Sequence, residues 1–595
     1  MSMDEYDILI KDATIVDGTG KGAYKGSVAV KGDKVVGVGD VKGDSKKVID
    51  AKGLTVVPGF IDSHSHAETG LLYSHLCESF AHQGVTTFIG GQCSSSPAPI
   101  GDEISLPGRA REHLYELIKY KYYPEKTTFP REQINALMKE KYGWTVDWHT
   151  MGDYFKVVEG RGFSVNYAPL VGHGTVRRFV MGDDWMRTTT REERDQMSEE
   201  IRKALEEGCI GMSYGLDYDP DTFADREEFV EHATVLNEYG AVLCPHSRRT
   251  GRRRDIAAGH RQHDKIDGIT EILDICRQSK VRMNIAHLFT GWYINPQGGP
   301  EMLEEANRRA TLTYIDAALE EGLDISFDVI PPVLPTKFSG SQYLCALFMP
   351  WLREFGSREE FAKWLKVKDF REELKDSMKR GKFFIRVAYN PNTNPRWAEN
   401  ITVLAHKDPE AVDKSIADIA EARGANPLDT WFDLIVEDPD AKSAVGAASN
   451  PYANYHAIFY QHPKSAVGLD TGVDDYVYES KVAPWSVPGI SIYSAFVGFF
   501  DKFVNVMKAL TLEEAVHKTS TQAAVRHKLE GRGVIKEGYY ADIVAMNLPN
   551  MKVTATPLET RRKPTGIQYV LVNGVPIVEK AEHTGAKPGR VLKRV

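Results

Sequence analysis

The sequence predicts an α/β fold: a (β/α)8 TIM-like barrel with a small β-sandwich domain formed from both chain ends. Eight short apolar runs, each typical of a buried strand, recur along the chain, and segments with helical periodicity lie between most of them. Polar side chains follow many of these runs, and a barrel gathers the ends of its strands onto one rim. A doubly wound open sheet is the competing architecture, and the many polar strand ends favour the barrel.

The eight runs define the order of the predicted barrel strands. In chain order they read TVVPGFID, VTTFIGG, SVNYAPLVG, CIGMSYG, AVLCPHS, RMNIAHL, DISFDVIP and SAVGLD. Two insertions, at about residues 100–160 and 331–460, interrupt the alternation of strands and helices. Connections of this length typically serve as lids or binding elements.

The two chain ends share a pattern of short strands and tight turns. Residues 1–55 alternate β-forming residues with glycine and aspartate turns, and residues 533–595 resume the pattern, with a hairpin signal at Asn573–Gly574. We expect these two segments to build the small β domain together. Residues 56–532 would then form the barrel and its insertions.

The composition is typical of a globular protein and excludes several classes of partner. Apolar residues make up 42% and charged residues 26%, and 83 acidic against 74 basic residues give a net charge of −9, which does not favour nucleic acid. We find no signal peptide and no run of 18 apolar residues, so no membrane partner is expected. Six cysteines without a CxxC pair favour a cytoplasmic location over a disulfide framework.

The segment PGFIDSHSH places His64 and His66 after the first apolar run. Residues i and i+2 of a strand point to the same side, so the two imidazoles would converge on one point. Two solvated histidines in a loop are the alternative. At the end of a barrel strand, the pair predicts metal binding.

Four further runs end in a residue that can bind a metal or transfer a proton: Cys93, His246, His287 and Asp470. Each alone is more typical of a structural residue, but a barrel brings these ends together. A thiolate with imidazoles suits Zn²⁺. Asp470 is the natural general base, because it could take a proton from a water that zinc acidifies and return it to a leaving nitrogen. These parts predict hydrolysis of an amide, cyclic amide, ester or amidine.

Other polar residues near the predicted rim are candidates for substrate contact. Arg248 lies two residues after His246 and offers a bidentate partner for a carboxylate. His173 and Arg177 follow the third run and either contact substrate or brace the rim. Tyr214, with Asp217 nearby, is also expected to face the rim, whereas Asp328 is expected to support a ligand rather than bind the metal.

The quoted motifs resemble a known superfamily. PGFIDSHSH, the split β domain and RGVIKEGYYADIVAMN resemble the amidohydrolase superfamily. Within it, VTTFIGGQCSSSP, NYAPLVGHGTVR, GMSYGLDYDPDTFAD and LEEAVHKTSTQAAVRHKLEGRGVIKEG are similar to the N-acyl-D-amino-acid deacylase (D-aminoacylase) group. The resemblance implies a tight zinc site at Cys93, His246 and His287, a second, weaker site at His64 and His66, and a catalytic Asp470.

The resemblance also implies an activity and its alternatives. It implies deacylation of an N-acyl-D-amino acid or related N-acyl amine, with a small-molecule amide as partner; a homo-oligomer is compatible with the sequence. A cyclic amide or imide hydrolase is the alternative, although run four has no lysine to bridge two metals as in hydantoinases and dihydroorotases. A non-catalytic scaffold is disfavoured because every expected ligand is retained.

Two departures from the group concern the substrate. Phe289 stands where the group usually has a lysine, and the aromatic segment PWSVPGISIYSAFVGFFDKF replaces its usual HPR…GTF segment. Both changes remove cations and add apolar residues. We therefore expect a substrate that is less anionic or more aromatic.

Overall fold

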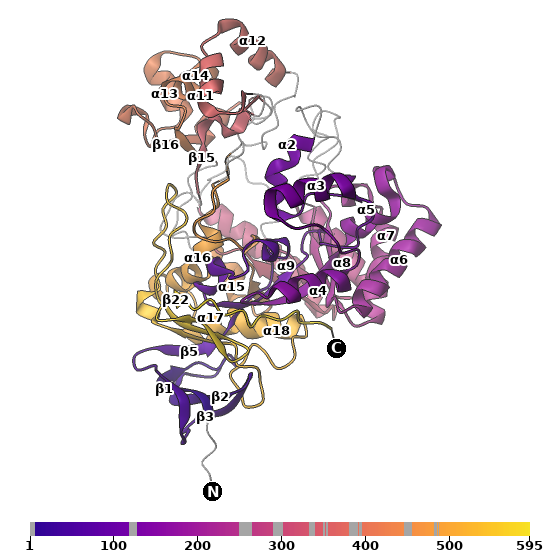
Figure 1. Ribbon diagram of the computed structural model, residues 1–595, viewed down its shortest axis with the longest axis vertical. Coiled ribbons are helices and arrows are strands. Elements are labelled where there is room, and N and C mark those ends of the chain that lie inside the picture. The colour runs from indigo at the N-terminus through magenta and orange to yellow at the C-terminus, as the bar shows by residue number, and fades with distance from the viewer. Residues whose placement is uncertain are drawn as a thin grey trace.

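Two large sheets organise the computed structural model (Figure 1). It describes residues 6–117, 128–248, 265–288, 301–332, 340–348, 351–352, 355–379, 391, 395–445, 455–480, 485 and 487–594. Phe289 and part of the second insertion lie outside these residues. Among the helices described, none combines the length and the apolarity needed to cross a bilayer.

Eight parallel strands form the near-barrel, which confirms the predicted fold class. The strand order is β18-β14-β13-β12-β11-β10-β7-β6. The strands are β6 (Phe60–Asp62), β7 (Val85–Gly90), β10 (Asn166–Gly172), β11 (Gly211–Gly215), β12 (Val242–His246), β13 (Arg282–Ile285), β14 (Ile325–Val329) and β18 (Ser465–Val467). Nearly all their residues are buried, as expected of parallel strands that are covered on the outside by helices.

Backbone hydrogen bonds between loops close the ring between β6 and β18. The Ser63 N–H donates to the Val467 carbonyl at 3.1 Å, and the Asp470 N–H donates to the His64 carbonyl at 2.8 Å. The His66 N–H donates to the Thr471 carbonyl at 2.9 Å. This closure holds the segment of the two histidines directly against the loop after the last strand.

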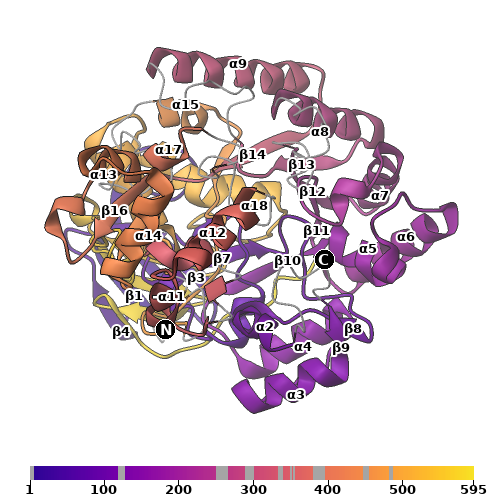
Figure 2. The same ribbon diagram turned by 90° about the horizontal axis from the view of Figure 1, so that it is seen from above.

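Helices cover the outer face of the barrel (Figure 2). They include α1 (Glu78–Ala81), α4 (Met151–Arg161), α5 (His173–Met181), α6 (Arg191–Glu206), α7 (Arg226–Glu238), α8 (Lys265–Ser279), α9 (Glu301–Glu320), α15 (Tyr455–Gln461), α16 (Ser491–Phe499), α17 (Leu512–Val516) and α18 (Gln522–Arg526). Helix α6 begins at a capping box in which the Thr190 hydroxyl accepts the Glu193 N–H. Its buried face carries Met197, Ile201 and Leu205, spaced four residues apart as one helical stripe requires.

Strands from both chain ends form a nine-stranded sheet. They are β1 (Tyr6–Ile15), β2 (Tyr24–Lys31), β3 (Lys34–Gly39), β4 (Ser45–Asp50), β5 (Thr55–Pro58), β19 (Ile543–Met546), β20 (Ile567–Val572), β21 (Val575–Glu579) and β22 (Glu582–His583). Asn573 and Gly574 both have positive φ between β20 and β21, as the predicted hairpin requires. The first apolar run divides: TVVP pairs with β1 and β19 in this sheet, and only FID enters the barrel.

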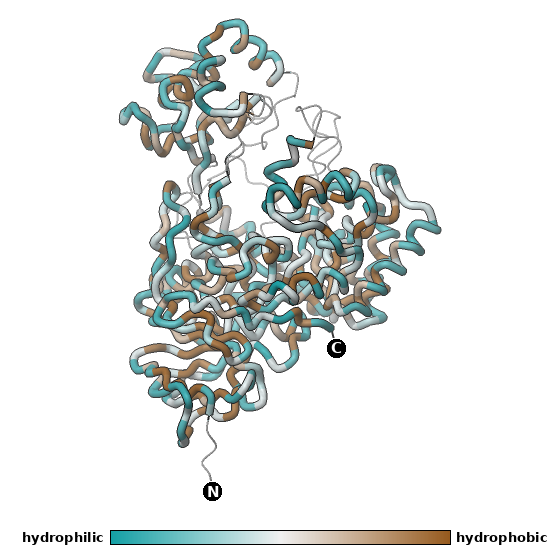
Figure 3. Tube along the Cα trace, viewed as in Figure 1, coloured by the Kyte–Doolittle hydropathy of each residue, from teal (hydrophilic) through white to brown (hydrophobic). Residues whose placement is uncertain are grey.

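The two insertions fold into structures of their own. The first contains β8 (Glu103–Ile104), α2 (Leu114–Leu117), β9 (Phe129–Pro130) and α3 (Arg131–Tyr142). The second contains β15 (Gln342–Tyr343), α11 (Arg358–Trp364), α12 (Lys368–Ser377), β16 (Ile401–Ala405), α13 (Ile416–Arg423), α14 (Pro427–Glu437) and β17 (Lys442–Val445). Its buried apolar residues, including Phe348, Phe361 and Trp431, form a core separate from that of the barrel. The second insertion forms the upper lobe in Figure 1, and Figure 3 shows apolar and polar segments alternating along its helices.

Candidate metal centre

Side chains from five strand ends converge at one end of the barrel. The Cys93 Sγ atom lies 3.5 Å from His64 Nε2, 3.4 Å from His246 Nδ1 and 3.7 Å from His287 Nε2. His66 Nε2 lies 3.1 Å from Asp470 Oδ1. The structure therefore brings together all six residues that the sequence singled out for metal binding and proton transfer.

Their donor atoms form two groups that share one atom. One group contains His64, His66, Cys93 and Asp470, and the other contains Cys93, His246 and His287. Within each group the donor atoms all lie within 4.8 Å of one another. The Cys93 sulfur belongs to both groups, so a thiolate there could face either of two cations.

The distances around Cys93 fit a tetrahedral ion. Zinc binds thiolate sulfur at about 2.3 Å and imidazole nitrogen at about 2.05 Å, so two such ligands of a tetrahedral ion lie about 3.6 Å apart. The observed sulfur–nitrogen distances of 3.4 and 3.7 Å to His246 and His287 bracket this value. The donor set of one sulfur and several imidazoles is also the set that zinc prefers.

The backbone is unusual at three of these residues. Cys93, His287 and Asp470 have φ angles of 50°, 32° and 53°, in the left-handed region that residues other than glycine rarely adopt. Such conformations persist where the surrounding structure enforces them, and they cluster at functional sites. Residue type and strand position found these side chains, but the sequence carried no signal for their backbone conformation.

Buried carboxyl groups lie behind the donor atoms. Asp328 accepts hydrogen bonds from the His287 N–H and the Asn284 side chain, both at 2.7 Å, and lies 3.8 Å from His64 Nδ1. Asp62 accepts the N–H groups of His64 and Leu469. Burial raises the pKa of Asp62 to about 8, against these hydrogen bonds, and raises the pKa of Asp328 well above its usual range. A nearby cation would favour the charged form of both groups, so the residues present fit a metal.

Carboxylates that contact a metal-binding histidine hold its ring in a fixed orientation. Asp217 Oδ2 lies 3.4 Å from His246 Nε2, a carboxylate–histidine pair on the side away from Cys93. Sequence reasoning had noted Asp217 and Asp328 at strand ends. It missed Asp62 and Asn284, although the position of Asp62 two residues before His64 places both on the same side of the chain.

The centre opens towards solvent on one side. The side chains of His66 and Asp470 keep 32% and 29% of their surface exposed, whereas His64 and His246 are fully buried and His287 is 2% exposed. These two side chains therefore form the solvent-accessible edge of the centre. The general base that the sequence predicted occupies the accessible edge.

Arg248 lies at the end of β12, as expected, but it already has a partner. Its Nε donates to the Glu271 carboxylate of α8 at 2.9 Å, and its Nη1 donates to the Leu216 carbonyl at 3.0 Å. A substrate carboxylate would have to share this guanidinium with Glu271 or displace it.

The other three candidates for substrate contact are fully buried; for His173 and Arg177 this fits the alternative that they brace the rim, whereas the sequence predicts that Tyr214 faces the rim. His173 is the first residue of α5 and lies 2.9 Å from Asp221 and 3.3 Å from Glu228 of α7. Arg177 pairs with Glu228, and the Tyr214 hydroxyl donates to the Phe229 carbonyl of α7. His173 and Arg177 face the helix layer because α5 begins directly after β10, and Tyr214 of β11 faces it because its hydroxyl bonds to α7.

The aromatic segment after residue 484 also differs from the expectation. Tyr493, Phe496 and Phe500 are fully buried, and the Phe496 and Phe500 rings pack against Phe60 with centroids 5.5 and 5.1 Å apart. These residues therefore belong to the core between α16 and the barrel. They do not provide an aromatic wall for a substrate.

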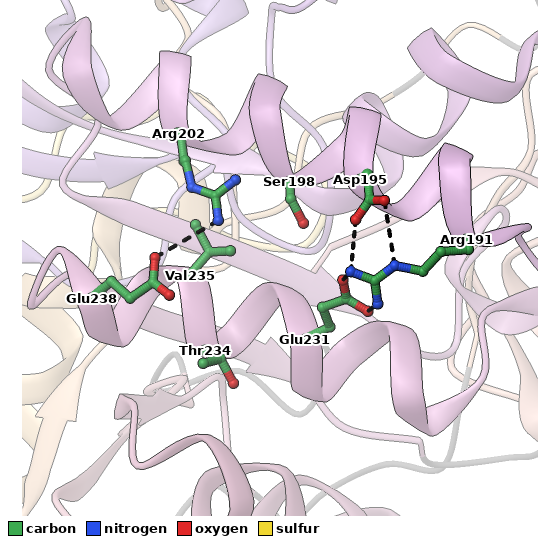
Figure 4. A pocket seen from close by; sticks show the side chains of 8 residues that line it. All are labelled: Arg191, Asp195, Ser198, Arg202, Glu231, Thr234, Val235 and Glu238. Atoms are coloured by element: carbon green, nitrogen blue, oxygen red, sulfur yellow. Dashed lines mark hydrogen bonds and ion pairs between the residues drawn. The ribbon is translucent and has the colours of Figure 1, made fainter.

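A groove between α6 and α7 lies away from this centre (Figure 4). Arg191 pairs with Asp195 at 2.7 Å and with Glu231 at 3.0 Å, and Arg202 lies 3.8 Å from Glu238. Both arginines of the groove are paired with carboxylates of the groove, and its lining does not include the donor residues. We assign it no role in the chemistry.

Comparison with known proteins identifies the family. A model of the amidohydrolase family matches residues 47–241 and 486–578, which include His64, His66 and Cys93. The chain belongs to the amidohydrolase family. The resemblance drawn from the sequence motifs is thereby confirmed.

Several relatives match this amidohydrolase over its whole length. D-aminoacylase from Alcaligenes xylosoxydans xylosoxydans is 25% identical over 590 residues, covering 99% of this chain and 98% of the relative. N-acyl-D-aspartate deacylase from the same organism is 26% identical over 595 residues, covering 98% and 95%. The crystal structure of D-aminoacylase superposes with a TM-score of 0.67 at 25% identity, covering 99% and 100%. N-acyl-D-glutamate deacylase from Bordetella bronchiseptica, complexed with zinc and a phosphonate inhibitor, shares the fold at a TM-score of 0.65 and 23% identity, covering 99% and 100%.

Proposed function

We propose that this amidohydrolase catalyses the zinc-dependent hydrolysis of a C–N amide bond, in an N-acyl-D-amino acid or a related N-acyl amine. The observation that carries the proposal is the position of Cys93, whose sulfur lies 3.4 Å from a His246 nitrogen and 3.7 Å from a His287 nitrogen, the separations expected of ligands that share one tetrahedral ion. The full-length similarity to D-aminoacylases supports the choice of bond.

The two overlapping donor groups suggest two sites of different strength. Cys93, His246 and His287 would hold the tight zinc ion, since both histidines are buried and each has a carboxylate nearby that fixes it. His64 and His66 would hold a weaker second ion together with Cys93 and Asp470. Zinc is the first cation to test because the related D-glutamate deacylase structure contains it.

Zinc, when bound, polarises a carbonyl oxygen and makes a neighbouring water acidic enough to attack at neutral pH. Asp470 provides the proton transfer. Its carboxylate takes a proton from the attacking water while the water oxygen bonds to the acyl carbon. It then delivers that proton to the amine nitrogen as the C–N bond breaks, which leaves a carboxylate and a free amine and regenerates Asp470.

The chain positions Asp470 for both transfers. Its N–H is fixed by the His64 carbonyl, its left-handed backbone turns the side chain towards the histidines, and its oxygen contacts His66. Arg248 is the proposed partner for a substrate carboxylate, in exchange for Glu271. Because Phe289 replaces the lysine usual in the group, we propose that substrates with fewer negative charges are preferred.

A hydrolysis screen tests this proposal. Metal-depleted protein is titrated with Zn²⁺ and assayed on N-acyl-D-amino acids, their L-enantiomers, uncharged aryl amides and cyclic imides, with released amine as the readout. We expect zinc-dependent release from open-chain N-acyl-D substrates. Zinc-dependent opening of cyclic substrates alone would favour the cyclic amide hydrolase, and protein that binds no zinc would refute the proposal.

A further inference from the structure

The loop after β7 presents Cys93 through two consecutive left-handed residues. Cys93 has a φ of 50° and Ser94 a φ of 70°, and two adjacent residues other than glycine rarely adopt this conformation. The direction of the Cys93 side chain depends on this backbone. Whatever holds Ser94 in place therefore also determines where the Cys93 sulfur lies.

Hydrogen bonds hold Ser94 from several sides. Its N–H donates to the Ser213 hydroxyl at 2.9 Å, and its carbonyl accepts the Thr175 N–H at 3.2 Å. Its own hydroxyl accepts the Gly174 N–H and donates to the Asp221 carboxylate. Asp221 is thus the acidic group that anchors this loop.

Close approach of neighbouring backbone restricts the loop further. A Cβ on Gly215 would lie 2.7 Å from the Cys93 carbonyl oxygen, and a Cβ on Gly174 would lie 2.7 Å from the Ser94 hydroxyl. A Cβ on Gly172 would collide with the Ser94 carbonyl. Real Cβ atoms do not approach this closely, so these three positions need glycine for the loop to pack as it does.

Asp221 is fully buried and uses both of its oxygens. It lies at the start of the short 3-10 helix Asp221–Phe223, and besides Ser94 it accepts the Gly215 N–H at 2.9 Å and a hydrogen bond from His173 Nδ1 at 2.9 Å. On its other side, His173 Nε2 lies 3.3 Å from Glu228, which is paired with Arg177. The raised pKa of His173 favours its protonated form, in which two carboxylates face one guanidinium and one imidazolium and the charges balance.

The buried cluster around His173 and Glu228 could be a further metal site or a structural anchor, and its charge balance decides between the two. His173, Glu228 and His232 lie close enough to hold a cation. Arg177 is already paired with Glu228, however, and a divalent ion would add uncompensated positive charge to a fully buried site. The cluster therefore serves better as a neutral anchor than as another metal site.

We propose that Asp221 is a positioning residue that fixes the Cys93 sulfur for metal binding by holding Ser94, an inference that rests on the proposed zinc centre. Removing the acceptor would release the Ser94 hydroxyl and let the two left-handed residues relax. The sulfur would then leave the position in which it faces His246 and His287.

The test compares zinc affinity in Asp221→Ala, Ser94→Ala and Asp221→Asn, measured by competition with a chromophoric chelator. Losing a partner that orients a ligand typically lowers metal affinity about 10- to 100-fold. We expect a loss in this range for D221A and S94A, and no further loss in the double variant. D221N should remain close to wild type, because its carbonyl still accepts from Ser94 and Gly215 while His173 can bond its amide group as the neutral tautomer.

A spectroscopic signal separates positioning from general destabilisation. In cobalt-substituted protein, the thiolate-to-cobalt absorption should weaken or shift in D221A and S94A but not in D221N. Asp542→Ala is the matched control, since Asp542 is also a buried aspartate but contacts Asn166 at the opposite end of β10. It should reduce stability without changing zinc affinity or the cobalt spectrum.

The outcomes distinguish this inference from the proposed function. Wild-type protein that binds no zinc overturns both. Wild-type protein that binds zinc, with a D221A or S94A variant that binds it equally well, overturns the role of Asp221 alone. The role of Asp221 is also refuted if D542A or D221N loses as much zinc affinity as D221A does. If D221A does not fold, S94A decides.

Discussion

Replacing His173 by glutamine should change how the stability of the protein depends on pH. Burial lowers the pKa of His173, but Asp221 and Glu228 outweigh this and raise it from 6.5 to about 9. A base whose pKa is raised by folding stabilises the fold fully below its unfolded pKa, and this stabilisation is lost as pH rises through the folded pKa. For His173 the loss falls between pH 6.5 and pH 9.

The size of the effect follows from the same values. One pKa unit corresponds to about 1.4 kcal/mol, so the shift represents roughly 3 kcal/mol of stability at pH 6 that is lost above pH 9. Glutamine fills similar space but carries no titrating proton. His173→Gln should therefore lack this component of the pH dependence.

The assay is urea unfolding with a chelator present, monitored by tryptophan fluorescence at pH 6 and at pH 9.5. The pKa of Lys518 is lowered by burial to about 8, which makes stability rise with pH over part of this range, but both proteins share that contribution. The wild type should lose roughly 3 kcal/mol more than H173Q between the two pH values. Equal changes in the two proteins would refute the charged pairing of His173 with Asp221 and Glu228.

Four further substitutions test the centre and its surroundings. Asp470→Asn should lower kcat about 100- to 10,000-fold while the tight zinc ion at Cys93, His246 and His287 stays bound, because the proton transfer is lost; unchanged kcat would exclude Asp470 as the base. His246→Ala should weaken zinc binding, measured by chelator competition, by more than the roughly 10- to 100-fold loss expected when a residue that only orients a ligand is removed. His66→Ala should leave the tight ion in place. Equal loss of zinc affinity in the two variants would contradict two distinct sites. Phe496→Ala should reduce the free energy of unfolding by about 3–5 kcal/mol in urea while folded protein retains its kcat; a selective change in kcat would instead place Phe496 at the substrate.

The sequence predicted the barrel and the identity of the centre well, for a physical reason. Parallel strands covered by helices are apolar along their length, so the polar residue that ends each run is conspicuous. Cys93, His246 and Asp470 were found in this way, and the structure brings them together. Their roles as ligands and base remain predictions that the experiments above test.

Other features depend on contacts that composition does not reveal. TVVPGFID reads as one strand, yet β5 and β6 pair in different sheets, because pairing partners and not local apolarity decide the sheet. Arg177 and Tyr214 turn away from the mouth because α7 provides their partners, Glu228 and the Phe229 carbonyl. The aromatic residues of α16 are equally apolar in a core or in a pocket, and only the packing against Phe60 distinguishes the two. The division into a terminal β domain and a barrel with insertions remains a prediction.

The way in which the ring is closed links catalysis to completion of the chain. His66 and Asp470 are separated by 404 residues, and the separate lobe of the second insertion lies between β14 and β18. During synthesis, Cys93, His246 and His287 all emerge before that lobe, but Asp470, the proposed base, follows the last barrel strand. On the proposed mechanism, hydrolysis therefore requires that the final strand dock beside the first, because only then does Asp470 lie next to His66.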